Sequence, residues 1–276
     1  MFDVNAVNTV DQDTVERPTV SFPLIMFRKG APAQRKAGGV SYEGGWFIAD
    51  DKGGSDLAAD LEANGWIRDS FISESEEGGE IEGYWTKQIT VSIVLDRHKW
   101  IETDTGGYSK EQYLVFVKGL EDKGLFQLTF SGHTAMAFKG VKTYFKSGVL
   151  SSFDRTVIAA ANALTKPKVW PRRAFWLTVG ASTDAKGQPL FTSVGKGDKT
   201  TPIVLPVPIG LPEKANIDKE TLGKFFVGTE FLKIANDAYT DNESWKEWPT
   251  NEDESVDHAS DNGPTVKENE LSELGI

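Results

Sequence analysis

The sequence predicts a β-rich fold of the α+β class. Its 276 residues are 39% hydrophobic and 11% aromatic, which is typical of a globular chain with a substantial core. From residue 84 to residue 100 (YWTKQITVSIVLDRHKW), apolar and polar residues alternate, as in a strand with one face on the core. Helical patterns interrupt the strands at 133–165 and close the folded part at 218–239. We therefore expect antiparallel strands with inserted helices and a C-terminal helix.

The first strands are expected to flank a basic loop. Residues 1–17 are polar and without period, which predicts a flexible N-terminus. TVSFPLIMF, beginning at Thr19, favours a strand, and Pro23 places it at a sheet edge or a bulge. A glycine-rich loop with four cations follows at 28–45, before a second strand from Trp46. Such a loop suits the wrapping of a phosphate backbone, or is a surface loop with incidental charge.

Further elements complete the first half of the chain. Ser55 as the N-cap and Gly65 as the stop delimit a short helix. An acidic loop follows at 73–82 (SESEEGGEIE). QYLVFVKG (112–119) and LFQLTFS (125–131) then favour a β-hairpin around the turn Glu-Asp-Lys-Gly.

The second half mixes helices with extended segments. The region 133–165 favours two helical pieces broken at Gly148, and Asp218 is a natural cap for the closing helix. AFWLTVGAS (174–182) favours a strand whose alternation places Trp176 on the face opposite the core. That indole is then a candidate for stacking on a base, unless a second apolar layer covers this face. Together these elements predict a single folded domain over 18–240.

Charge is distributed unevenly along a chain whose net charge is −11. Residues 139–199 hold eleven Lys or Arg against three acids, whereas residues 241–276 hold eleven acids against two lysines. A segment kept positive in an acidic chain indicates a polyanionic partner. Aromatic residues alternate with these cations, and this combination is typical of proteins that bind single-stranded nucleic acid. The alternative is a solvated basic face over an aromatic core.

The basic segment and the basic loop supply the candidate nucleic-acid-binding residues. Cations neutralise phosphates and aromatic rings stack on bases, so the two kinds of side chain are assigned different roles. The phosphate-contacting candidates are Arg28, Lys29, Arg35, Lys36, Lys139, Lys142, Lys146, Lys168, Arg172 and Arg173. The stacking candidates are Tyr84, Tyr144, Trp170 and Trp176.

Other kinds of chemistry find little support. The chain has no cysteine and three well-separated histidines, so we predict neither a metal site nor a cofactor. GKGDKTT (195–201) lacks the spacing and the following helix of a phosphate-binding loop. Asp104, Glu121 and Lys123 make only a weak fragment of a magnesium-dependent nuclease site, and His133 lies in no nucleophile motif. We predict no catalytic residue and a protein that is not an enzyme.

The C-terminal segment is expected to be a disordered acidic tail over residues 241–276. It ends with an apolar tip formed by Leu271, Leu274 and Ile276. A charged tether with an apolar tip can dock into the groove of a partner protein. It can also fold back on the basic surface of its own chain and mimic nucleic acid, or serve only to keep the protein soluble.

These features resemble the single-stranded DNA-binding proteins of bacteria, phages and plasmids. The resemblance is architectural and rests on the segment Lys139–Lys199, the loop Arg28–Lys36 and the tail Asp241–Ile276. It implies an OB-like antiparallel β-barrel, of the oligonucleotide-binding type, and a tail that docks replication or recombination proteins. The bacterial tails end in an acidic run followed by Pro-Phe, whereas this chain ends in Leu-Gly-Ile.

We therefore expect a single-stranded DNA-binding protein that acts in replication or recombination without sequence specificity, with RNA as an alternative ligand. A cytoplasmic location without membrane contact is expected, because no apolar run reaches ~20 residues and the N-terminus is unlike a secretory signal. A homo-oligomer is compatible with this expectation. The alternatives are a structural or assembly protein of a virus or mobile element, and a magnesium-dependent nuclease.

Overall fold

The structure, a computed structural model, describes residues 21–30, 43–72, 79–103, 106–140, 148–195, 200–213 and 217–248. Within these ranges the fold is β-rich and of the α+β class, as the sequence predicts. The strands are β1 (Leu24–Arg28), β2 (Gly45–Ala49), β3 (Ile67–Ile72), β4 (Glu80–Thr86), β5 (Gln88–Thr103), β6 (Gly106–Val117), β7 (Phe126–Ser131), β8 (Leu177–Ala181), β9 (Phe191–Val194), β10 (Thr201–Val204) and β11 (Pro206–Pro208). The helices are α1 (Ala58–Ala63), α2 (Gly132–Lys139), α3 (Val149–Phe153), α4 (Ala159–Leu164), α5 (Lys219–Phe225) and α6 (Thr229–Asp241), with short 3₁₀ helices that include η6 (Arg172–Ala174) and η8 (Glu243–Lys246).

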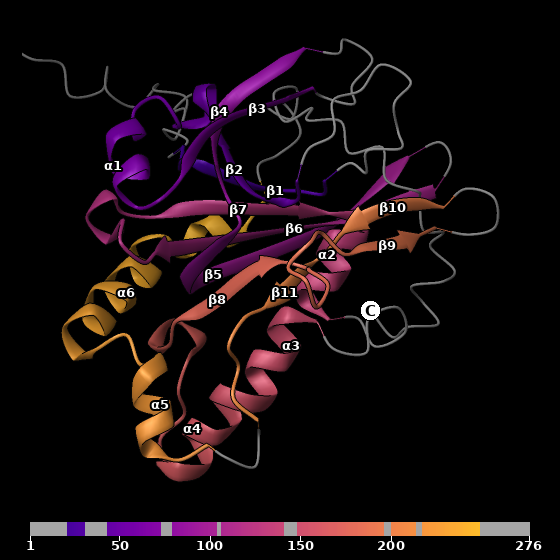
Figure 1. The fold of residues 1–276 in the computed structure, drawn as a ribbon. Coiled ribbons are helices and arrows are strands. Elements are labelled where there is room, and N and C mark those ends of the chain that lie inside the picture. The colour runs from indigo at the N-terminus through magenta and orange to yellow at the C-terminus, as the bar shows by residue number, and fades with distance from the viewer. Residues whose placement is uncertain are drawn as a thin grey trace, which may run out of the picture.

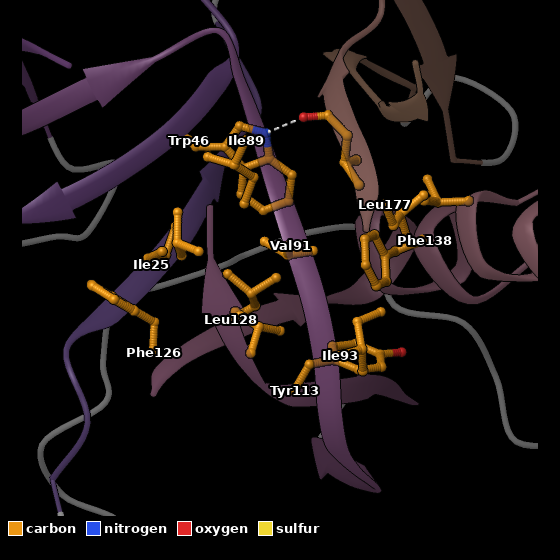
Figure 2. Close-up of a cluster of buried hydrophobic side chains, with 14 of the residues drawn as sticks. Ile25, Trp46, Ile89, Val91, Ile93, Tyr113, Phe126, Leu128, Phe138 and Leu177 are labelled. Carbon is orange, nitrogen blue, oxygen red and sulfur yellow. Dashed lines mark hydrogen bonds between the residues drawn. The ribbon is translucent and has the colours of Figure 1, made fainter. Parts of the chain in front are cut away.

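One curled sheet dominates the described fold (Figure 1). Its nine strands lie in the order β11-β8-β5-β6-β7-β1-β2-β4-β3, and β9 pairs separately with β10. The curl brings together strands that are far apart in this order. The indole N–H of Trp46 on β2 donates to the backbone oxygen of Val179 on β8 at 3.0 Å, which Figure 2 shows as a dashed line. This hydrogen bond satisfies a buried polar group and holds the two sides of the curl against each other.

The inner face of the curl holds the main core. Ile89, Val91 and Ile93 point inward from β5, as their alternation predicts, and all three are buried (Figure 2). Phe130 of β7 stacks on Phe138 of α2 with ring centroids 4.2 Å apart. Helices α3 and α4 are joined by a π-helical turn into one rod, and Figure 1 shows this rod below β8 and β11.

A second, smaller apolar cluster lies on the outer face of β5 and β6, beneath α6. Phe116 of β6 meets Phe231 of α6 edge to face, with ring centroids 5.1 Å apart. The pairing of β5 with β6 shifts register between Ile93 and Leu95. This bulge places both Val94 and Leu95 in the outer cluster. The odd-numbered residues of β5 therefore face the main core up to Ile93 and face outward at Leu95.

The observed elements confirm some of the sequence predictions and correct others. The hairpin of β6 and β7 is present, and Asp218 caps α5 by accepting a hydrogen bond from the backbone N–H of Thr221 at 2.7 Å. The expected strand 84–100 is instead divided between β4 and β5, and the expected acidic loop 73–82 includes the first residues of β4. In addition, the described fold continues through Trp248, past the expected start of the tail. In the described part of the chain, none of the helices has the length and apolar character needed to cross a membrane.

The hairpin of β5 and β6 extends beyond the neighbouring strands. Strand β8 pairs with β5 only between Gln88 and Val91, and β7 follows β6 only as far as Lys110. Beyond these points the described residues add no third strand to the sheet. Residues 100–103 of β5 and 106–109 of β6 therefore form a two-stranded arm.

Candidate nucleic-acid interface

Two of the predicted cations, Arg172 and Arg173, lie together on η6 and contact different partners. Arg172 makes a bidentate pair with Asp154, with Nε–Oδ1 at 2.9 Å and Nη2–Oδ2 at 2.6 Å. This pairing raises the pKa of Arg172 and already satisfies two of its donors. Arg173 donates from Nε to Asn236 at 2.6 Å and lies 4.2 Å above the ring of Tyr239. Desolvation lowers the pKa of Arg173.

Lys168 and Trp170 contact each other in the connector ahead of η6. The ammonium group of Lys168 is exposed and lies 3.7 Å from the centre of the Trp170 ring. That ring also packs edge to face against Phe175 and Phe226, each with centroids 5.7 Å apart. Its N–H donates to the hydroxyl of Thr165 at 2.7 Å. Trp170 is therefore a half-buried residue that packs on the main core beneath an exposed cation.

The structure corrects the expectation that the Trp176 indole faces outward. Alternation does place it on the face opposite the main core, but α6 covers that face. The indole is 9% exposed and packs against Phe231 of α6 with ring centroids 5.2 Å apart. The alternative of a second apolar layer is the one observed, so Trp176 does not offer a free ring to a base.

Arg28 and Tyr84 are also buried rather than presented to solvent. Arg28 is 4% exposed and forms an ion pair with Asp69 of β3 at 2.6 Å. Its guanidinium lies 5.6 Å from the ring centres of Phe47 and Trp85. Tyr84 is 5% exposed, so neither side chain is placed to contact a nucleic acid.

Among the described residues, the two other predicted cations, Lys139 and Lys29, have partners on different strands. Lys139 forms an ion pair with Glu111 at 3.0 Å, and this carboxylate is buried on the inner side of β6. Lys29 accepts a backbone hydrogen bond at 2.7 Å from Val204 of β10. Eight predicted residues fall outside the described residues. They are the nucleic-acid candidates Arg35, Lys36, Lys142, Tyr144 and Lys146, and the tail residues Leu271, Leu274 and Ile276.

The structure instead assembles a different basic and aromatic surface at the base of the arm. The outer face of β5 and β6 there carries Arg97 and Lys99 of β5 and Lys110 of β6, and the segment after α6 returns to cover them with Trp245 and Trp248. We call these five residues the β5–β6 strip. Both indoles are partly exposed, so the strip combines cations with accessible aromatic surface.

Arg97 anchors the returning segment on the strip. Its guanidinium lies 4.0 Å from the ring centre of Trp245 and 4.4 Å from that of Trp248. It donates from Nε to the Gln112 side chain at 2.8 Å, and from Nη1 to the backbone oxygens of Trp245 at 2.8 Å and Glu247 at 3.1 Å. Trp248 donates its indole N–H to the backbone oxygen of His98 at 3.0 Å. The segment is thus fixed by several directional contacts.

Lys99 and Lys110 lie close together on the strip although both side chains are positively charged. They are direct cross-strand partners, and their ammonium groups lie 4.6 and 5.9 Å from the centre of the Trp248 ring. Desolvation, followed by the charges of Lys110 and Arg97, lowers the pKa of Lys99. Like charges at opposed positions repel each other across an antiparallel pair.

Sequence reasoning did not identify the strip, although parts of its signal are visible. Arg97 and Lys99 alternate in DRHKW and therefore share a face of β5. Trp245 and Trp248 stand out in WKEW at the start of an otherwise polar segment. Their meeting depends on the register of β5 with β6 and on a return of the chain from the end of α6, which no local pattern reveals.

Neither a metal-binding cluster nor a similar known protein points to a function for the described residues. Among the residues that the structure describes, no cluster of three or more His, Asp or Glu is arranged to hold a metal ion. No protein-family model, curated protein or solved structure matches the chain.

Proposed function

We propose that this chain binds single-stranded nucleic acid on the β5–β6 strip, as a non-enzymatic protein of replication or recombination in the cytoplasm. The observation that carries the proposal is the placement of Lys99 directly opposite Lys110, beside the indole of Trp248. Two opposed ammonium groups repel each other, and a phosphate bound between them would reduce that repulsion. A cation whose pKa is lowered by burial and neighbouring charges, as that of Lys99 is, is a candidate for function.

The division of roles within the strip follows from its contacts. Arg97 is occupied by Gln112 and by the backbone of the returning segment, so we assign it to positioning. Lys99 and Lys110 are assigned to phosphate contacts. Trp245 and Trp248 are assigned to stacking, because their rings are already held by Arg97 and remain partly exposed. Rings held rigid before binding lose little entropy when a base stacks on them.

A single strand is favoured over a duplex by the aromatic part of the strip. Bases present their faces for stacking only when they are unstacked from their neighbours. Two indoles beside two lysines would therefore contribute fully only with an unpaired strand. Contacts to phosphates and ring faces carry no sequence information, which supports binding without sequence specificity.

The OB-like barrel belongs to the same proposal. The curl of the sheet supports it, since Trp46 on β2 reaches Val179 on β8 across the interior. The order of nine strands, with β11 and β3 at its ends, goes beyond the five strands of a minimal OB barrel. In this proposal, the arm of β5 and β6 is an extended hairpin of that barrel.

The acidic tail is proposed to act on the same surface. Residues 249–276 follow Trp248 directly and hold eight acids against one lysine. Trp248, the last described residue, lies beside Lys99 and Lys110. In this proposal, carboxylates of the tail compete there with phosphates. Docking of a replication or recombination protein through Leu271, Leu274 and Ile276 would remove this competition.

Titration of the protein with oligo-dT, followed by intrinsic fluorescence, tests the proposed function. We expect quenching at low salt that is reversed by added salt, because phosphate contacts release counterions. The amplitude should fall in Trp248→Phe, which identifies the strip as the source of the signal. A duplex of the same length should bind more weakly.

Several results would contradict the proposal. Absence of quenching at low salt, with no binding by an independent method, would exclude the nucleic-acid ligand. A sharp oligomer that ignores DNA would favour a structural or assembly protein. Cleavage of a labelled strand in the presence of Mg²⁺ would favour a nuclease.

A further inference from the structure

A hollow of about 230 Å³ lies beside the bulge of β5. It is lined by Ile93, Val94, Asp96, Arg172, Arg173 and Tyr239, so three separate elements contribute to it. The bulge explains its position, because the register shift between Ile93 and Leu95 displaces β5 where the pairing with β8 has already ended. Its volume corresponds to about eight waters at ~30 Å³ each, which is enough for one small ring.

The charges around the hollow nearly cancel. Arg172 is paired with Asp154 and has Nη1 3.8 Å from Oδ1 of Asp96. The second cation, Arg173, is hydrogen-bonded to Asn236. A phosphate in this hollow would face the Asp96 carboxylate, whereas an uncharged ligand would not be repelled. The hollow therefore differs from the strip, where cations prevail.

The polar groups of the hollow suit the edge of a heterocycle. An ionised Asp96 only accepts hydrogen bonds, the guanidinium groups only donate them, and the Tyr239 hydroxyl does both. The edge of a nucleobase carries donors and acceptors side by side, and its faces are apolar. Ile93 and Val94 supply apolar surface, and the Arg173–Tyr239 stack at 4.2 Å supplies a planar wall.

The hollow and the strip share strand β5. At ~3.3 Å per residue, Val94 and Lys99 are about 16 Å apart on the strand. Tyr239 also links the two places, because its hydroxyl accepts a hydrogen bond from Lys246 of η8 at 2.8 Å. A strand bound on the strip can therefore reach the hollow with a neighbouring nucleotide.

We propose that the hollow between the β5 bulge, η6 and α6 takes one unpaired nucleobase of a strand bound on the β5–β6 strip. This inference rests on the proposed function, since the strip supplies the phosphate contacts. Asp96 accepts a hydrogen bond from a donor on the base edge, and Tyr239 with Arg173 flanks its face. Full binding therefore requires a base in the hollow, in addition to the phosphate contacts and ring stacking on the strip.

Asp96→Asn tests the site with little risk to folding, because the Asp96 side chain is 55% exposed. Asp51→Asn, with a side chain that is 73% exposed on the opposite part of the fold, is the charge-matched control. Each variant is titrated with oligo-dT and with an abasic oligonucleotide of the same length. Free thymidine, deoxyadenosine, deoxycytidine and deoxyguanosine are also tested by saturation-transfer NMR.

We expect Asp96→Asn to weaken oligo-dT binding about fivefold, the difference between a hydrogen bond to a charged and to a neutral acceptor. Binding of the abasic strand should be unchanged or tighter, because a negative charge has been removed. At least one nucleoside should bind to the wild type and to Asp51→Asn, and bind less to Asp96→Asn.

The two proposals fail in different ways. If Asp96→Asn leaves the preference for oligo-dT over the abasic strand unchanged, the base site is wrong while binding on the strip stands. If neither polymer binds, the proposed function is wrong. Binding of the free nucleosides then tests the hollow by itself. Failure of all four nucleosides to bind would then overturn the base site as well.

Discussion

Lys99 and Lys110 stand directly opposite each other across the hairpin of β5 and β6, and both ammonium groups face the ring of Trp248. A pair of like charges in this position destabilises the hairpin, while favourable cross-strand pairs contribute about 0.2–1 kcal/mol. In the proposed function, this pair is the feature that supports a binding surface rather than a solvated basic face.

The first prediction concerns the stability of the protein without a ligand. Replacing both lysines in Lys99→Gln/Lys110→Gln should raise the free energy of unfolding at low salt by about 0.5 kcal/mol, since the repulsion is removed. The gain should shrink at high salt, where charges are screened. Urea denaturation at two salt concentrations measures it. A lower stability at low salt would show that the lysines serve the fold.

The second prediction separates the returning segment from the tail. Truncation after Trp248 should tighten binding of oligo-dT at low salt, because competing carboxylates are lost. Truncation after Asp241 should instead weaken binding, since it also removes both indoles of the strip. Equal affinities for the full chain and the chain truncated after Trp248 would leave the tail without a role in competition.

The third prediction concerns the two kinds of tryptophan. Trp176→Ala should lower the free energy of unfolding by about 3 kcal/mol, because the indole is packed against Phe231 beneath α6. Trp248→Ala should change stability less and weaken binding by about 1–3 kcal/mol, the range for loss of a stacked base. Denaturation and titration of both variants test the contrast. A stable Trp176→Ala that no longer binds DNA would reverse these assignments.

The fourth prediction is a dependence of stability on pH that arises at His133. Burial, and secondarily the charge of Lys29, lowers the pKa of His133 in the folded state below its ordinary value of 6.5. The unfolded chain therefore binds this proton more readily. Stability should be greatest above pH 6.5 and fall as the pH drops from 6.5 toward the lowered value. In His133→Gln the decline across this window should be smaller, and an unchanged decline by urea denaturation at each pH would contradict the assignment.

Local patterns predicted the elements whose structure depends on local chemistry. Alternation identified the strand that carries Ile89, Val91 and Ile93, and the Asp218 cap identified the start of α5. Turn residues identified the hairpin of β6 and β7. In these cases periodicity and turn chemistry determine the conformation before tertiary contacts form.

The candidate site could not be predicted in the same way, because its contacts are distant in sequence. The charge of residues 139–199 alone does not include acids that the fold brings beside them from elsewhere in the chain, such as Asp96 beside Arg172. Arg28 has its ion pair on β3, and Trp176 is covered by α6, so neither environment is visible in the neighbouring residues. The β5–β6 strip likewise needs a strand register and a chain return.

The salt dependence of oligo-dT binding tests the central claim most directly. The slope of log affinity against log salt is compared among the wild type, Lys99→Gln/Lys110→Gln, and Lys186→Gln/Lys219→Gln as the charge-matched control on exposed lysines elsewhere. We predict that the strip variant loses about 1.4 units of slope, at ~0.7 for each phosphate contact, while the control keeps the wild-type value. An unchanged slope in the strip variant would contradict the assignment of phosphate binding to Lys99 and Lys110.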